Sequence, residues 1–135
     1  IRAELARSLE RELVVSGPIE AARERVIDAL ADEGFGVLTE IDVKATLKKK
    51  LDVDFKRYVI LGACNPPLAH RAISSEASIG ALLPCNVVLR QDGDEVVVDF
   101  MDPAAVMSLV DSPGIAQVAG EVRTRLERVR TAITD

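Results

Sequence analysis

Residues 87–100 read Val-Val-Leu-Arg-Gln-Asp-Gly-Asp-Glu-Val-Val-Val-Asp-Phe, and this stretch decides the class of fold. It contains two strand-like segments, Val87–Leu89 and Glu95–Phe100, with Asp92-Gly93 between them. Asp-Gly is a strong β-hairpin signal, because glycine accepts the backbone angles of a tight turn. Strands joined by so short a turn are antiparallel. The sequence therefore predicts a sheet that is at least partly antiparallel.

The rest of the chain adds helices and further strands. Amphipathic periodicity predicts a helix over residues 19–33, which Gly34 ends, and alternating apolar residues predict a strand over 35–41. Further predicted elements are a helical lead-in at 1–12, strands at 13–15 and 55–63, and helices at 43–51 (capped by Asp42), 104–110 and 115–133. We therefore expect one α+β domain over residues 1–135, a mostly antiparallel sheet with helices packed on one face.

A further helix begins at Asn65-Pro66, where asparagine suits the cap and proline the first turn. If this helix ran unbroken to residue 83, Glu76 would share its apolar face, and burying a lone carboxylate is costly. We expect a break near Ser74-Ser75, with Ser75 capping a second short piece. The break affects where residue 85 lies, because a straight helix would carry the chain to the opposite end of the sheet.

Composition narrows the classes of function. Hydrophobic residues make up 48% of the 135 residues and aromatic residues only 3%, so the core depends on aliphatic side chains. The net charge of −5 and the few aromatics disfavour nucleic-acid binding, and no apolar run is long enough to span a bilayer. We expect a cytoplasmic protein with free thiols and with no nucleic-acid or membrane partner.

Two segments carry the residues best suited to a ligand-binding or metal site. Residues 62–70 read Gly-Ala-Cys-Asn-Pro-Pro-Leu-Ala-His and residues 83–87 read Leu-Pro-Cys-Asn-Val. Each cysteine precedes an asparagine, which gives the candidate ligand-binding residues Cys64, Asn65, Cys85 and Asn86. The alternative reading is structural, because cysteine often packs as a small apolar residue and asparagine often caps helices. The functional reading requires Cys64 and Cys85 to meet in space.

A soft-metal site is the second possibility for the same segments. Cys64, Cys85 and His70 supply three ligands, and a thioether from Met107 would favour Cu(I) over zinc. Zinc would need a fourth ligand such as Asp102. The spacing of the cysteines matches neither a CxxC motif nor a zinc ribbon, and a surface histidine without a ligand is the simpler reading of His70.

Lysines and one arginine gather between residues 44 and 57. Such a run usually marks a solvated helix face, although it could attract an anion. The sequence shows neither a serine–histidine–aspartate order nor a glycine-rich phosphate loop. We therefore find no catalytic constellation.

Three segments resemble the bacterial and archaeal domain-of-unknown-function family 302. They are residues 61–69 (Leu-Gly-Ala-Cys-Asn-Pro-Pro-Leu-Ala), residues 79–88 (Ile-Gly-Ala-Leu-Leu-Pro-Cys-Asn-Val-Val) and Asp102-Pro103. The resemblance extends over about residues 13–133. It implies one curved antiparallel sheet with packed helices, similar to the TATA-binding-protein-like class, often as a homodimer. It implies no activity, and the fold alone does not give a function.

These observations lead to two functional hypotheses. We expect a non-enzymatic module, a homodimer without cofactor, that binds a small ligand or a protein partner near Cys64, Asn65, Cys85 and Asn86. The alternative is a thiol-redox or soft-metal protein, holding copper or zinc, that uses Cys64 and Cys85 with His70 or Met107. The distance between the two cysteines discriminates between them.

Overall fold

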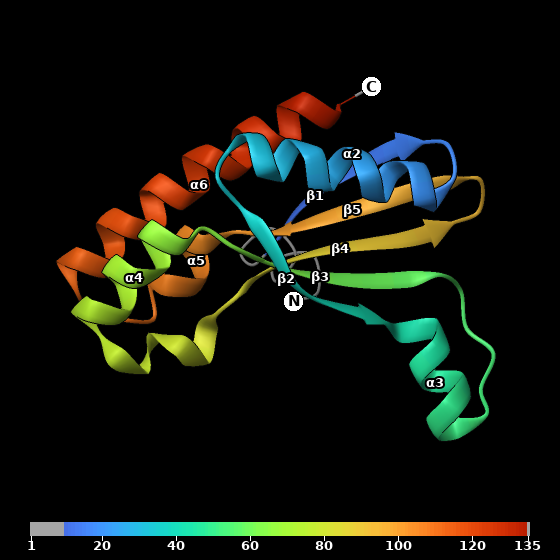
Figure 1. Cartoon of the computed structure of the whole chain (residues 1–135), viewed down its shortest axis with the longest axis horizontal. Coiled ribbons are helices and arrows are strands. Elements are labelled where there is room, and N and C mark those ends of the chain that lie inside the picture. The colour runs from blue at the N-terminus through green and yellow to red at the C-terminus, as the bar shows by residue number, and fades with distance from the viewer. Residues whose placement is uncertain (1–9, 135) are drawn as a thin grey trace.

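Five strands form one sheet at the centre of the computed structural model, which describes residues 10–134 (Figure 1). Neighbouring strands are all antiparallel, and their order across the sheet is β1-β5-β4-β3-β2. The strands are β1 (Glu10–Ser16), β2 (Gly36–Asp42), β3 (Tyr58–Cys64), β4 (Cys85–Asp92) and β5 (Glu95–Met101). The α+β fold expected from the sequence is confirmed, and so is the hairpin that joins β4 to β5.

Helices connect and cover these strands. They are α2 (Ile19–Asp32), α3 (Val43–Leu51), α4 (Pro66–Ser75), the 3₁₀ helix η1 (Ala77–Leu82), α5 (Pro103–Met107) and α6 (Pro113–Ile133). Figure 1 shows α2 and α6 together on one side of the sheet, whereas α3 lies beyond the end of β2, apart from both. Among residues 10–134, no helix combines the length and the apolar character that crossing a bilayer requires.

The core lies between the sheet and the helices that cover it. Alternate residues of a strand point to opposite faces, and one face carries nearly all the buried apolar strand residues. They include Val15, Val59, Leu61, Val87, Leu89, Val98 and Phe100. The helices contribute Val26, Leu30, Ile115, Val118, Leu126 and Val129, among others. Burial of this apolar set is the main stabilising term for the domain.

The opposite face of the sheet is not covered by α2 or α6. We call it the open face, and Val14, Ile60, Val88 and Val97 lie on it according to the strand register. Val97 is nevertheless buried, and its cross-strand neighbours are Val14 and Arg90. The sheet thus has one packed face and one that carries apolar and charged side chains together.

Helix boundaries follow the local chemistry that the sequence predicts. The carboxylate of Asp42 accepts a hydrogen bond from the backbone N–H of Ala45 and caps α3. The amide oxygen of Asn65 accepts one from the N–H of Leu68 and caps α4. The expected break after Ser75 is also present, and it leaves Glu76 only half-buried.

Three expectations need correction. The predicted lead-in helix falls on residues 1–12, of which 1–9 lie outside the described residues, and 10–12 belong to β1 because they pair with β5. Residues 55–57 are not part of a strand, since β3 begins only at Tyr58. Ser75 ends α4 instead of capping η1: Glu76 is the cap residue, and no side chain caps this helix.

Candidate functional site

Cys64 and Cys85 lie next to each other at one end of the sheet. Ala63 in β3 pairs directly with Cys85 in β4, so Cys64 is one residue from the position opposite Cys85. Directly opposed Cα atoms in antiparallel strands are about 4.5–5.5 Å apart, so the two cysteines are neighbours. The break after α4 explains this arrangement, because it lets η1 carry the chain back to the end of the sheet that it left. Both thiols are free.

An apolar pocket lies against these cysteines. It lies between the end of the sheet and helices α4, α5 and α6. Its lining is Phe35, Ala63, Cys64, Asn65, Leu68, Ala69, Ala72, Leu83, Pro84, Cys85, Met107, Val118 and Val122. Its cavity volume is about 20 Å³, which is room for little more than one water molecule. The walls therefore stand close together in this structure.

Burial controls the chemistry of Cys85. Desolvation raises the pKa of its thiol from 9.0 to about 11, and the neighbouring Cys64 acts on the pKa in the same direction. A thiolate is the form that attacks electrophiles, so at neutral pH a thiol with this pKa is a poor nucleophile. Cys85 is thus held as a neutral thiol in the pocket wall.

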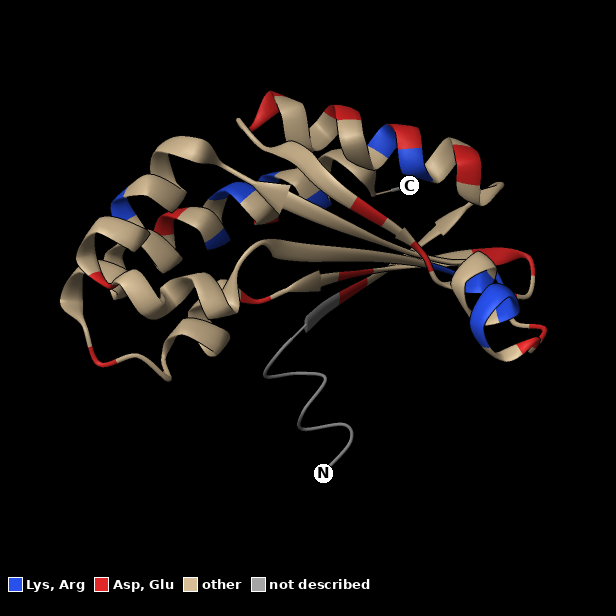
Figure 2. Cartoon of the chain, turned by 60° about the horizontal axis from the view of Figure 1, so that its bottom comes forward, with Lys and Arg blue, Asp and Glu red and all other residues tan. Residues whose placement is uncertain are grey.

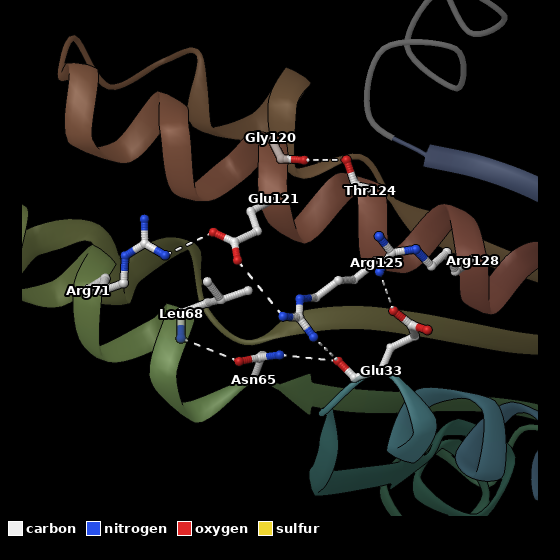
Figure 3. Close-up of polar contacts among 9 residues, drawn as sticks. All are labelled: Glu33, Asn65, Leu68, Arg71, Gly120, Glu121, Thr124, Arg125 and Arg128. Atoms are coloured by element: carbon white, nitrogen blue, oxygen red, sulfur yellow. Dashed lines mark hydrogen bonds and ion pairs between the residues drawn. The ribbon is translucent and has the colours of Figure 1, made fainter.

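Asn65 joins three helices at the edge of the pocket. Besides capping α4, its amide nitrogen donates to the backbone carbonyl of Glu33 at 3.3 Å. The guanidinium of Arg125 in α6 donates to the same carbonyl at 3.0 Å, and that of Arg128 to the Glu33 carboxylate at 2.9 Å. Figure 3 shows these side chains converging on the residue that follows α2. The buried amide is therefore already committed to structural hydrogen bonds.

Two glycines permit the close approach of backbone segments near the site. Gly34 has a φ of +84°, which side chains rarely adopt, and a Cβ there would lie 3.0 Å from Asn65 Nδ2. At Gly62 a Cβ would clash with Thr39 Oγ1 and lie 2.9 Å from Cγ of Pro84. Pro84 follows a cis peptide bond and precedes Cys85. These contacts fix the entry of β4 beside the end of β3.

The structure brings together only some of the predicted site residues. Met107 lines the pocket with Cys64, Asn65 and Cys85. His70 is exposed and lines a separate surface depression with Arg71 and Ser74. Asn86 is also exposed, and it pairs with Gly62 in the sheet instead of lining the pocket. Within residues 10–134, no three His, Cys, Asp or Glu side chains form a group that could hold a metal ion.

The rest of the pocket wall comes from residues that sequence reasoning did not place at the site. Phe35 follows α2, and Val118 and Val122 belong to α6. The apolar stripe of α6 is evident from periodicity, but which end of the sheet it covers depends on tertiary packing. The resulting chemistry is that of an apolar cavity with a soft, sulfur-rich wall.

Fold and site together define an α+β domain with an apolar pocket at one end of its sheet. The family model described as "Domain of unknown function DUF302" matches residues 11–133. The chain therefore belongs to this family, which confirms the resemblance noted in the sequence.

A solved structure supports the same assignment. The chain is similar to the uncharacterized conserved protein DUF302 from Bacillus stearothermophilus, whose crystal structure superposes with a TM-score of 0.85. The two share 28% sequence identity over 92% of this chain and 97% of that chain. No curated protein matches the sequence.

Proposed function

We propose that this domain is a non-enzymatic binding module whose ligand occupies the apolar pocket beside Cys64 and Cys85. The lining of the pocket carries the proposal: its walls are almost wholly apolar and include a few polar groups, which is typical of small-molecule sites. The ligand class that fits is a small apolar molecule or apolar group. Because the walls stand close together, they must separate slightly to admit it.

The state of the polar groups supports binding rather than turnover. Cys85 is a protonated thiol at neutral pH because burial raises its pKa to about 11. The amide of Asn65 bonds to Glu33 and Leu68 and has little capacity left for a substrate. A general base or activated nucleophile would need a different environment.

Benzene is a suitable probe, because small apolar pockets in proteins can bind it. We expect benzene to shift the methyl NMR signals of Leu68, Val118 and Val122. Ala69→Leu should fill the pocket and abolish these shifts, whereas the control Ala81→Leu, at an exposed position outside the pocket, should leave them unchanged. Shifts that are absent, or that survive Ala69→Leu, would contradict the proposal.

A second candidate function uses the sulfur atoms of the same pocket. The pocket lining that Cys64 and Cys85 share with Met107 favours it, since two thiolates and a thioether suit Cu(I) better than zinc. Alternatively, dissolved oxygen could oxidise the two thiols to a disulfide. A native mass spectrum of protein purified without chelator or reductant tests both. A metal adduct or a loss of two hydrogens, absent from Cys64→Ser, would support this function; a bare mass would contradict it.

The family resemblance also leads us to propose that the domain works as a homodimer. The open face of the sheet supports this, because it carries Val14, Ile60 and Val88, which neither α2 nor α6 covers. Sedimentation velocity over a range of protein concentrations measures the oligomeric state directly. A single monomeric species at every concentration would contradict the dimer and leave the proposed pocket untouched.

A further inference from the structure

Residues 43–57, which comprise α3 and the segment that follows it, form an arm that projects from the domain. None of the side chains in α3 is buried. In Figure 1 the helix lies beyond the end of β2, away from α2 and α6. Isolated helices of this length are marginal in water, because most helical stability in proteins comes from tertiary packing. The arm therefore lacks the packing that ordinarily holds such a helix in place.

Large apolar side chains of the arm face solvent. The exposed fractions are 66% for Leu51, 43% for Val53 and 40% for Phe55. Leu38 and Ile41 in the adjoining β2 are exposed at 68% and 47%. Five of the eight large apolar residues that are exposed in the described chain thus lie between residues 38 and 55. Such a concentration is typical of an interaction surface.

The charge of the arm is opposite to that of the rest of the chain. Its six basic and two acidic residues give a net charge of +4, which leaves −9 for the remainder of a chain whose total is −5. Figure 2 shows the basic residues gathered on α3. Lys44, Lys49 and Lys50 have no acidic partner among residues 10–134, whereas Lys48 pairs with Asp52 and Asp54. A partner for the arm should accordingly be acidic.

The open face of the sheet has the complementary character. Among the strand residues whose side chains the structure describes, those on this face include the acidic residues Glu12, Asp92, Glu95 and Asp99 and one basic residue, Arg90. Val14, Ile60 and Val88 lie on the same face. An apolar and acidic surface and an apolar and basic arm therefore occur in one molecule.

Asp99 provides an independent sign that the open face is incomplete. Its side chain is only 9% exposed, and Oδ2 accepts a hydrogen bond from Arg90 at 2.9 Å. Oδ1 is buried and has no hydrogen-bond partner within the described part of the chain. A buried carboxylate oxygen without a donor is costly. A cation arriving on the open face would relieve that cost.

We propose that two copies of this chain associate through these surfaces, the arm of each copy lying on the open face of the other. The proposal rests on the homodimer proposed above and names its interface. Two-fold symmetry lets each copy supply one arm and one face, so that both unpartnered surfaces are covered at once. The lysines of each arm contact the acidic residues of the facing sheet, and the apolar residues of the two surfaces are buried against each other.

A charge-swap experiment tests the interface. One variant reverses the charge of the arm (Lys44→Glu, Lys49→Glu, Lys50→Glu). The other reverses the charge of the open face (Asp92→Lys, Glu95→Lys). All five side chains are exposed. Each variant alone should be monomeric in sedimentation velocity, because like charges then face each other. An equimolar mixture should form a heterodimer, because both contacts regain opposite charges. Circular dichroism confirms that each variant is folded.

Substitution of an apolar residue in the arm, with a matched control outside it, gives a second test. Leu51→Ser in the arm should weaken the dimer by about tenfold or more in its dissociation constant, as loss of an interface contact predicts. Leu109→Ser, at a residue that is 79% exposed outside both surfaces, should not change it. A wild-type monomer would overturn both the homodimer and this interface. A dimer that survives arm reversal, or a mixture that stays monomeric, would overturn the interface alone.

Discussion

The amide nitrogen of Asn65 donates a hydrogen bond to the backbone carbonyl of Glu33, 32 residues earlier in the chain. The same side chain caps α4 through its oxygen, so one asparagine fixes both where α4 begins and where α2 ends. The sequence alone predicts the capping role and gives no sign of the bond to Glu33. This second bond makes Asn65 a structural part of the pocket wall.

Replacing Asn65 should therefore cost more than an ordinary helix cap. For Asn65→Ala we expect the free energy of unfolding to fall by about 2 kcal/mol, because the cap is worth about 1 kcal/mol and the bond to Glu33 a similar amount. Urea denaturation measures the change. The control is Asn86→Ala, at an exposed residue, which should change stability by less than about 0.5 kcal/mol.

Gly62 should not tolerate a side chain. A methyl group there would clash with Thr39 Oγ1 and press on Pro84, so Gly62→Ala should lower the free energy of unfolding by about 1–3 kcal/mol. Thermal denaturation followed by circular dichroism provides the measurement. Gly80→Ala is the matched control, because a Cβ at Gly80 meets nothing within 4 Å. Equal stability of the two variants would show that β2 and β4 can separate freely at Gly62.

The buried thiol of Cys85 should make stability depend on alkaline pH. Below pH 9 the thiol is protonated in both the folded and the unfolded state, so it has no effect on the pH dependence. Between pH 9 and 11 the unfolded chain loses the proton while the folded chain keeps it, so stability should fall by about 1.4 kcal/mol per pH unit. Unfolding curves of the wild type and of Cys85→Ala measure this contribution. If the free energy of unfolding fell equally steeply with pH in both proteins, the prediction would be contradicted.

The ion pair between Arg90 and Asp99 should respond asymmetrically to substitution. Arg90→Met leaves a buried carboxylate without its cation, and we expect a loss of about 2–3 kcal/mol, less than for a fully buried pair because Arg90 is 25% exposed. The double substitution Arg90→Met and Asp99→Leu should recover most of the loss. Urea denaturation of the single and double variants decides this, and a double variant as unstable as the single one would argue against it.

Local signals explain what the sequence could predict. The Asp92-Gly93 turn, the Asp42 and Asn65 caps and the break after Ser75 each depend on a few adjacent residues, and all are present in the structure. The helix predicted over residues 10–12 is wrong because their strand conformation depends on β5. Arg11 pairs with Phe100, and nothing near Arg11 in the sequence indicates that partner.

The site was also predictable only in part, because some of its geometry depends on residues that are far apart in the sequence. The predicted break in the helix allowed Cys85 to return beside Cys64 without requiring it, and the structure has both the break and the return. The positions of His70 and Asn86 relative to the pocket depend on the rotation of α4 and the facing of β4, which neighbouring elements determine. The role proposed for the lysines of α3 needed the structure, because solvated lysines are common and only the projection of the helix distinguishes these.

The pairing of Glu10 with Met101 has a consequence for how the protein is made. Ribosomes deliver the chain from its N-terminus, so β1 emerges early and remains without its backbone partner until β5 has been synthesised. During that interval Leu13, Val14 and Val15 form a strand edge open to other nascent chains. The hairpin of β4 and β5 is thus both the last part of the sheet to be synthesised and the part that ends this exposure.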